Sequence, residues 1–401
     1  MKLTISRDAL AAALDRVGRV VETRNTIPIL SNVRLVARPP EQAAANGGTS
    51  NGTIAVTGTD LDMEAISTAE AEVVAPGETT LPAKMASDFV RKLPAGAKVE
   101  LADDGERGKL TIKSGRSRIS VNTLPSGDFP DLSAGDFSNS FALPASALLN
   151  MLDRVSFAIS SEETRYYLNG IYLHVAQSED GPALRVVATD GHRLAQHQVQ
   201  APQGTENLPG VIVPRKAVGE IARLLKPLGE ESVRLEVSTT KLRLTAGVTT
   251  LTTKLIDGTF PDYGRVVPSG NDKVAALDKE ALGEAVGRVS TVSNERGRAV
   301  KFSFAPPEQA SGTDGVANGA RGALTLTVQN PDMGNATDEL EAAYDAEPLD
   351  IGFNASYVAE ILAAVPGARV QMAMADAGAP CLITSEADGA GSLFVLMPMR
   401  V

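Results

Sequence analysis

The sequence has few of the residues that most often carry covalent or metal chemistry. Its 401 residues include one cysteine, three histidines and no tryptophan, and aromatic residues make up 4%. The single cysteine, Cys381, cannot form an internal disulfide. The opening residues MKLTISRDAL contain neither the apolar core of a signal peptide nor an arginine-rich transit pattern. These features lead us to expect a protein of the reducing cytoplasm.

Long apolar runs and catalytic motifs are also missing. No run approaches the about 18 apolar residues that a membrane-spanning helix needs, so we expect no membrane segment. The sequence has no phosphate-binding loop, no dinucleotide-binding glycine motif, no HExxH and no CxxC. His174, His192 and His197 lack a nearby cysteine and the spacing of a zinc site. We therefore expect no catalytic residue, no metal and no cofactor, and the protein is not expected to be an enzyme.

What the sequence does contain is an internal repeat. The segment 148–175 has an earlier copy at a constant offset of 138, in which LDRV at 14–17 matches LDRV at 152–155. In a weaker third copy, Arg288 falls opposite Arg154. Three units of about 134 residues agree with the usual size of a domain. We expect the domains to span residues 1–134, 135–268 and 269–401.

Each unit is expected to contain two helices and several strands. In the first unit, Leu10, Leu14 and Val17 fall at helical spacing after Ser6, which is a suitable N-cap. Alternating runs such as 109–113 are typical of antiparallel strands joined by hairpins. This order predicts an α+β fold dominated by antiparallel sheet. The six helices are expected at residues 7–20, 83–93, 145–158, 214–226, 278–290 and 354–365.

The predicted helices differ in charge from the rest of the chain. They carry 13 basic and 9 acidic residues, a net charge of +4, whereas the whole chain carries −11 and the remainder therefore −15. An acidic total argues against a protein that coats nucleic acid over its whole surface. It permits a protein that binds an anion through its helices.

Six motifs along the repeat resemble a known family. RYYLNG begins at Arg165, ATDGHRLA at Ala188, VPRK at Val213, DGTFPDY at Asp257 and FNASYV at Phe353, and MPMRV ends the chain. In this order they resemble the beta subunits of bacterial DNA polymerase III, the sliding clamps. The similarity runs from Met1 to Val401.

The resemblance implies a head-to-tail homodimeric ring of six similar domains, with helices lining the hole and sheets outside. Such a ring encircles duplex DNA without reading its sequence and tethers the replicative polymerase as a processivity factor. The clamp loader and repair proteins with clamp-binding motifs are its other implied partners. A net basic set of helices facing phosphates agrees with this expectation.

The resemblance also assigns residues to surfaces. The positions that it places facing DNA are Arg24, Arg165, Tyr166, Tyr167, Arg215 and Lys216. Near Arg165 the family has a glutamine where this chain has Glu162, whose carboxylate would repel a phosphate. The implied contact between the first and third domains, which closes the ring, pairs Ile119 and Val121 with Thr291 and Val292.

The family's partner site is an apolar pocket between the second and third domains that takes short peptide motifs. Methionine and leucine adapt to varied apolar peptides, while arginine and histidine are expected to form a polar rim. Gly297 stands where some clamps have a large aromatic residue, so one wall is expected to be open. Carried over to this chain, the pocket comprises Leu168, Thr189, Gly191, His192, Arg193, Leu194, Pro261, Arg265, Val266, Asn354, Tyr357, Val395, Leu396, Met397, Pro398, Met399, Arg400 and Val401.

Two other functions remain open from the residues. A repeat scaffold that binds peptides but never encircles DNA would leave the basic helices unexplained. An enzyme that uses Asp190 and His192 would need an activated nucleophile or a metal set, which the sequence does not provide.

Overall fold

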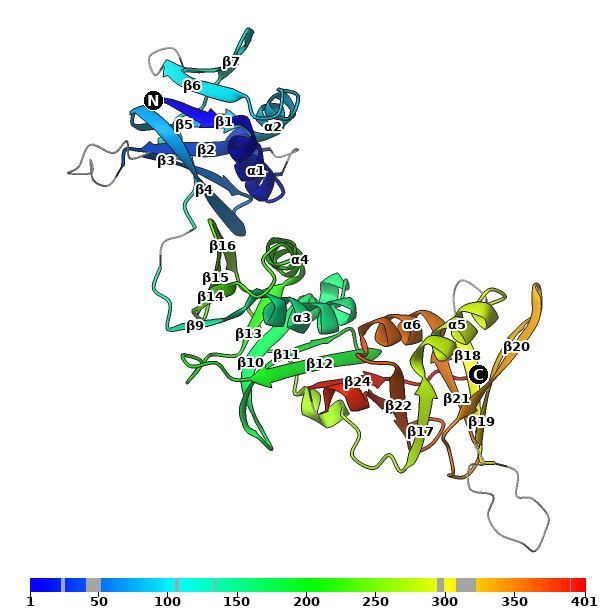
Figure 1. Ribbon diagram of the computed structural model, residues 1–401. Coiled ribbons are helices and arrows are strands. Elements are labelled where there is room, and N and C mark those ends of the chain that lie inside the picture. The colour runs from blue at the N-terminus through cyan, green and yellow to red at the C-terminus, as the bar shows by residue number, and fades with distance from the viewer. Residues whose placement is uncertain are drawn as a thin grey trace, which may run out of the picture. The chain divides into compact units, whose positions relative to one another are not determined.

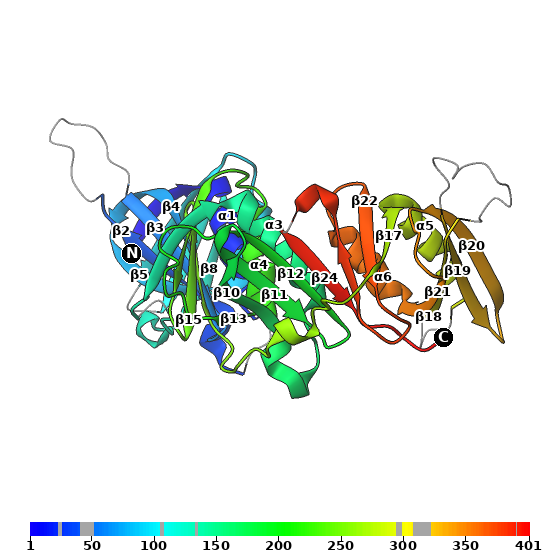
Figure 2. The same ribbon diagram turned by 90° about the horizontal axis from the view of Figure 1, so that it is seen from below.

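The computed structural model describes residues 1–22, 26–40, 52–104, 108–132, 135–293, 299–307, 322–389 and 391–401 (Figures 1 and 2). Two expected site residues, Arg24 and Gly297, lie outside these ranges. The chain forms two compact units. The first comprises residues 1–149, 202–209 and 216–255, and the second comprises residues 150–201, 210–215 and 256–401.

The first unit is built on a 12-stranded antiparallel sheet. The main path of the sheet runs through β8 (Ser117–Asn122), β7 (Lys109–Ser114), β6 (Lys98–Asp104), β1 (Lys2–Ser6), β4 (Met63–Ala75), β16 (Thr249–Lys254), β15 (Lys241–Ala246), β14 (Ser232–Val237) and β9 (Asn139–Pro144). Three further strands, β2 (Asn32–Arg38), β3 (Gly52–Thr59) and β5 (Gly77–Pro82), extend it from β4.

The second unit contains two antiparallel sheets. The strand order of the eight-stranded sheet is β13 (Val211–Pro214), β10 (Gly170–Ser178), β11 (Gly181–Thr189), β12 (Arg193–Gln200), β24 (Ser392–Leu396), β23 (Cys381–Thr384), β22 (Arg369–Met374) and β17 (Lys273–Asp278). The order of the four-stranded sheet is β20 (Gly334–Ala342), β19 (Gly322–Asn330), β18 (Ala299–Ala305) and β21 (Leu349–Asn354).

All six expected helices are present, and none ends more than three residues from its predicted end. Ser6 caps the first helix as expected, because its hydroxyl accepts a hydrogen bond from the Ala9 amide at 3.1 Å. Asn354 caps the last helix in the same way through the amide of Ser356 at 2.9 Å. The helices are α1 (Arg7–Gly18), α2 (Ala83–Arg91), α3 (Ala145–Val155), α4 (Arg215–Leu225), α5 (Lys279–Ser290) and α6 (Ala355–Ala364).

The helices cover apolar faces of the sheets. α1 packs on α2 and β4, and α5 packs on α6 and on the four-stranded sheet (Figure 1). Beneath α5 and α6, Phe302 and Phe353 are fully buried and meet edge to face with ring centroids 5.2 Å apart. None of the helices in the described ranges has the length and apolar character that crossing a membrane requires.

Consecutive repeats are joined by strand pairing, and the joint occurs twice. β4 of the first repeat pairs with β16 of the second, placing Ala65 opposite Leu251. β12 of the second repeat pairs with β24 of the third, placing Ala195 opposite Phe394. β4 and β12 are the same strand in successive copies, and so are β16 and β24. The two joints therefore have the same register.

Backbone hydrogen bonds at the ends of the two joints repeat in the same way. At one end the Thr68 amide donates to the Val248 carbonyl at 3.0 Å, and the Gln198 amide donates to the Gly391 carbonyl at 2.8 Å. At the other end the Lys254 amide donates to Asp62 at 2.8 Å, and the Met397 amide donates to His192 at 2.9 Å. The two joints therefore have the same strand register and the same hydrogen bonds at both ends of the paired strands.

Candidate functional site

The predicted DNA-facing residues of the central repeat begin in a short 3₁₀ segment, Glu163–Leu168. Tyr166 is 55% exposed and meets Tyr167 edge to face at 5.8 Å. Arg165 interrupts the helical geometry with φ −113° and ψ 52°. The segment therefore exposes Tyr166, leaves Arg165 partly buried and buries Leu168 at its end.

Arg165 is held by an anion of its own loop. Its Nε donates to the Glu162 carboxylate at 2.6 Å, and its guanidinium also donates to the Asp190 carbonyl at 3.2 Å. The hydrogen bond from Arg165 holds the pKa of Glu162 below its usual range. Glu162 thus acts as an internal counter-ion of Arg165, in addition to the repulsion of phosphate expected from the sequence.

The remaining predicted DNA-facing residues lie at the start of α4. Arg215 is exposed. Lys216 is paired with Asp60 at 2.5 Å and with Glu22 at 3.6 Å. Burial disfavours its charge, but the two carboxylates outweigh burial, so the pKa of Lys216 is raised. Among the described residues, two carboxylates pair with Lys216 and no ion pair involves Arg215.

The predicted partner pocket has an apolar floor. Leu168, Leu194 and Val395 are buried together in one cluster with Phe260. Phe260 stacks on Tyr172 with the rings 4.9 Å apart and nearly parallel at 3°. The structure thus brings together residues from the segments 163–168, 193–200, 256–266 and 392–396, which the sequence separates widely.

The turn before β12 forms one side of this region. Thr189 Oγ1 accepts from the Gly191 amide at 3.1 Å, and Asp190 Oδ1 accepts from the His192 amide at 2.9 Å. Gly191 has a φ of +89°, a conformation that favours glycine. His192 is exposed and stacks on Tyr357 with the rings 6.1 Å apart.

Arg193 has a different environment from the one that the sequence suggested. Its side chain is only 8% exposed, and its guanidinium lies between the rings of Phe157 at 5.0 Å and Tyr357 at 4.3 Å. It pairs with Asp190 at 3.2 Å and with Glu360 of α6. Arg193 therefore connects the turn before β12 to α6 from a buried position, whereas His192 lies at the surface.

The C-terminal residues run beside β21. The Met399 amide donates to the Gly352 carbonyl at 2.8 Å. A β-carbon on Gly352 would lie 2.4 Å from the Met399 carbonyl oxygen and 2.5 Å from the Val401 side chain. Only glycine at this position leaves room for the tail in its present place.

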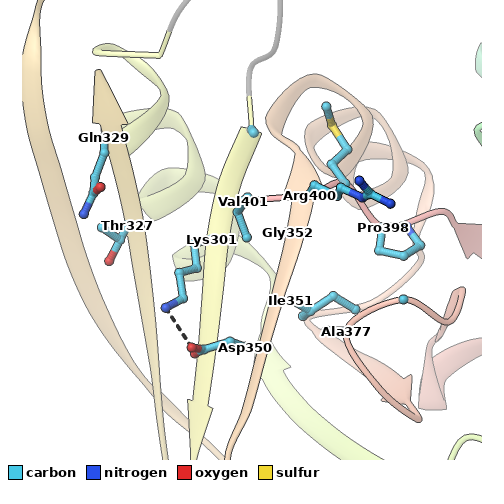
Figure 3. A pocket seen from close by; sticks show the side chains of 13 residues that line it. Lys301, Thr327, Gln329, Asp350, Ile351, Gly352, Ala377, Pro398, Arg400 and Val401 are labelled. Atoms are coloured by element: carbon cyan, nitrogen blue, oxygen red, sulfur yellow. Dashed lines mark ion pairs between the residues drawn. The ribbon is translucent and has the colours of Figure 1, made fainter. Parts of the chain in front are cut away.

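A cavity of about 1050 Å³ opens beside the tail (Figure 3). Figure 3 shows the ion pair between Lys301 and Asp350, 2.7 Å apart, which lies within this cavity. Pro398, Met399, Arg400 and Val401, which belong to the predicted partner site, line this cavity. The other lining residues were not anticipated: Ala299, Lys301, Thr327, Gln329, Asp350, Ile351, Gly352, Ala377 and Gly378.

The other expected pocket residues are mostly at the surface. Pro261 and Val266 are exposed, and Arg265 pairs with Asp262 at 2.9 Å in the same segment. Leu396 is fully buried, whereas Met397 is 39% exposed. The expected site therefore consists of a buried floor, an exposed rim and the tail.

The residues expected to close the ring lie on an open sheet edge and after a helix. Ile119 and Val121 belong to β8, the edge strand of the first unit's sheet. Thr291 ends α5 as its C-cap. The Val292 carbonyl accepts from the Asn330 side chain at 2.8 Å.

Two of the three histidines are shielded from solvent, His197 fully and His174 in part, and this has a consequence for stability. His174 is hydrogen-bonded to the Tyr263 hydroxyl at 2.9 Å and to the Val175 carbonyl at 3.1 Å, and His197 contacts Ser392 at 2.7 Å. Burial lowers the pKa of both rings below its usual value. The unfolded chain, with ordinary histidine pKa values, therefore binds more protons near pH 6 than the folded chain does.

We expect replacement of His174 by glutamine to reduce the pH dependence of stability. The wild-type free energy of unfolding should fall as pH decreases from about 7 toward 5, because the unfolded histidines are protonated first. The measurement is urea unfolding at several pH values. His192→Gln, which replaces an exposed ring, is the matched control and should retain the wild-type slope. An unchanged slope in His174→Gln would contradict this role.

Three copies of one α+β unit, joined edge to edge by equivalent strands, define the class of clamp-fold binding proteins. Family models for DNA polymerase III beta subunits match the chain three times: the N-terminal domain at residues 1–133, the central domain at 142–262 and the C-terminal domain at 316–400. The chain belongs to this family, the bacterial beta sliding clamps.

Individual members of the family are similar to this chain over their full lengths. The beta sliding clamp of Caulobacter vibrioides is 44% identical over 401 residues, and that of Escherichia coli K12 is 34% identical over 404, with complete coverage of both chains in each case. Among solved structures, the Bartonella birtlesii clamp bound to griselimycin superposes with a TM-score of 0.88 at 43% identity. A Caulobacter crescentus clamp gives 0.89 at 44%, and both comparisons cover the whole chains. The family comprises non-catalytic processivity factors of DNA polymerase III.

Proposed function

We propose that two copies of this chain close head to tail into a ring that encircles duplex DNA and tethers the replicative polymerase. The observation that carries this proposal is the repeated joint between strands. β4 and β12 each pair with the last strand of the following repeat, but their counterpart in the third repeat, β20, pairs only with β19 in the described part of the chain and is the edge of its sheet. The corresponding last strand of the first repeat, β8, is also an edge. A second copy supplies the missing partner at both places.

The two internal joints predict the register of the closing one. The residue of β20 equivalent to Ala65 and Ala195 is Ala336, and the residue of β8 equivalent to Leu251 and Phe394 is Ile119. Ala336 of one copy is therefore opposite Ile119 of the other, and Thr337 is opposite Arg118. By the same equivalence, the hydrogen bonds at the two ends of the closing joint run from the Glu339 amide to the Arg116 carbonyl and from the Asn122 amide to the Met333 carbonyl. Met333 is 65% exposed in the single chain, and this pairing would cover it.

The expected contacts at Thr291 and Val292 are adjacent to this pairing, because Asn330 at the end of β19 binds the Val292 carbonyl. Each of the proposed domains, 1–134, 135–268 and 269–401, contributes one strand to each of two joints: β4 and β8, β12 and β16, and β20 and β24, respectively. Open sheet edges of this kind are natural sites for pairing with another chain. Cytoplasmic location is part of the same proposal, since the replicated DNA lies there.

The proposed contacts to DNA are sequence-independent and come from Arg24, Arg165, Tyr166, Tyr167, Arg215 and Lys216. Partner peptides bind at the apolar floor around Leu168 and Val395 and against the tail. The Bartonella relative binds griselimycin. We infer that griselimycin also binds this chain.

We expect Glu162→Gln to strengthen binding to duplex DNA. The carboxylate of Glu162 accepts a hydrogen bond from Arg165, so a phosphate must compete with Glu162 for the guanidinium. Its removal should tighten binding about threefold at low salt. The measurement is fluorescence anisotropy with a labelled duplex.

Glu163→Gln is the matched control for this prediction. Glu163 is the exposed neighbour of Glu162, so the substitution changes net charge equally without touching Arg165. Equal tightening in both variants would mean that only net charge matters and that Glu162 has no specific role.

Retention on nicked circular DNA tests the proposed function directly. After assembly by a clamp loader, the protein should remain on the circle and should leave when a restriction enzyme cuts the circle once. Ordinary affinity does not depend on whether DNA has ends. Retention unaffected by cutting would exclude a ring, and failure to load, with a loader active on its own clamp, would favour the peptide scaffold.

A further inference from the structure

One residue connects the two proposed surfaces. Arg165 belongs to the DNA-facing set, yet its guanidinium lies against Gly191 of the partner pocket. A β-carbon on Gly191 would be 2.6 Å from Arg165 Nη1. The hydrogen bond from Arg165 to the Asp190 carbonyl, at 3.2 Å, fixes the same turn. The side chain is 38% exposed, so it is accessible from solvent while it holds this contact.

The turn that Arg165 contacts leads directly to the tail. The His192 carbonyl accepts the Met397 amide at 2.9 Å, and the His192 ring stacks on Tyr357. The turn is also held by short-range bonds within residues 189–193, from Thr189 and Asp190, and by the pairing of Arg193 with Glu360. Arg165 therefore stabilises the turn through a contact from another segment of the chain. It does so on the side where we propose that DNA binds.

A phosphate and the turn compete for the same guanidinium. Glu162 lies within the same loop as Arg165, so the side chain can bind Glu162 and Asp190 at once. A DNA phosphate lies outside the protein, and Arg165 must turn outward to pair with it. The pairing replaces Glu162 as the anion and removes the contact with Asp190 and Gly191.

We propose that Arg165 is a positioning residue of the partner pocket, so that DNA contact at Arg165 weakens the binding of a partner peptide. This inference rests on the proposed function, because it requires both surfaces. Coupling between two sites is reciprocal in free energy. A bound partner therefore loosens the contact between Arg165 and DNA, which lets a clamp carrying its polymerase move along the duplex with one fewer attachment.

The test compares peptide affinity in two states of the same protein. One state is the free dimer, and the other is the dimer loaded on nicked circular DNA and separated from loader by gel filtration. The probe is a fluorescein-labelled peptide with the clamp-binding motif of a bacterial polymerase III catalytic subunit. We expect the wild type to bind it about fivefold more weakly when loaded. Arg165→Gln should bind the peptide equally in the two states.

Arg215→Gln is the matched control. It removes an arginine from the same DNA-facing set, and none of the side-chain contacts described for the pocket turn involves Arg215. This variant should keep the wild-type ratio between free and loaded affinities. A purely structural role of Arg165 would lower both affinities by the same factor and leave the ratio unchanged in Arg165→Gln.

The outcomes distinguish a failure of the proposed coupling from a failure of the ring or of the pocket. Absence of retention on the circle contradicts the ring, and absence of peptide binding to the free dimer contradicts the pocket. If the wild type loads and binds the peptide but shows equal affinity in both states, the inference itself is wrong. A ratio that persists in Arg165→Gln contradicts the assignment to Arg165.

Discussion

Replacing Thr337 with proline is expected to convert the dimer into monomers. The repeated register places the Thr337 amide toward Arg118 of the partner copy, as the equivalent Gln196 amide faces β24. Proline has no N–H and adds a ring at the paired edge. The hydrogen bond alone contributes about 1 kcal/mol at each closing joint, and the dimer has two closing joints. The dimer dissociation constant should therefore rise on the order of thirtyfold or more.

The chain should still fold, because proline is tolerated on an edge strand when its nitrogen faces solvent. Sedimentation should show the mass change from twice the chain mass to 41.8 kDa at micromolar concentration. Thr337→Val keeps the N–H and the branched side chain, and it should remain dimeric. A dimeric Thr337→Pro protein would mean that the ring closes elsewhere on the surface.

Replacing Gly352 with alanine is expected to remove the tail from β21 and to weaken partner binding. The added β-carbon would lie 2.4 Å from the Met399 carbonyl oxygen, so a backbone atom must move. Because Met399 and Val401 are part of the proposed pocket, peptide affinity should fall about tenfold. The dimer mass should not change, because β8 and β20 are untouched. Fluorescence anisotropy and sedimentation measure the two quantities.

Gly287 on α5 provides the matched glycine. A β-carbon there meets no atom within 4 Å, and alanine is the better helix former. Gly287→Ala should therefore leave peptide affinity unchanged.

Deletion of residues 399–401 is expected to have the same effect as Gly352→Ala. Loss of the dimer together with the peptide would show that the tail is only part of the core.

Much of the architecture could be read from the sequence because it depends on local signals. The six helices follow apolar spacing and caps such as Ser6 and Asn354, which act within a few residues. The repeat itself is visible as a constant offset. The pairing of β4 with β16 could not be read in this way, since Ala65 and Leu251 are far apart in sequence and nothing in either strand specifies the other.

The site was less accessible to sequence reasoning for the same physical reason. The burial of Arg193 depends on Phe157 and Tyr357, which come from different repeats, so its motif suggested a surface role. Lys301 and Asp350 were missed because each is an ordinary polar residue in an alternating strand. They become part of a cavity only when the tail lies beside them. The glutamate at position 162 was recognised, but its bond to Arg165 requires the conformation of the loop.

The most direct test of the ring is to close it covalently on DNA. Ile119→Cys and Ala336→Cys in one chain would place two cysteines opposite each other at each joint, and the native Cys381 is buried. After loading on nicked circular DNA and oxidation, a closed ring should give a species that survives denaturing detergent on the circle and is released when the circle is cut. Formation of no crosslink, or detergent release from intact circles despite complete crosslinking, would contradict the closed ring.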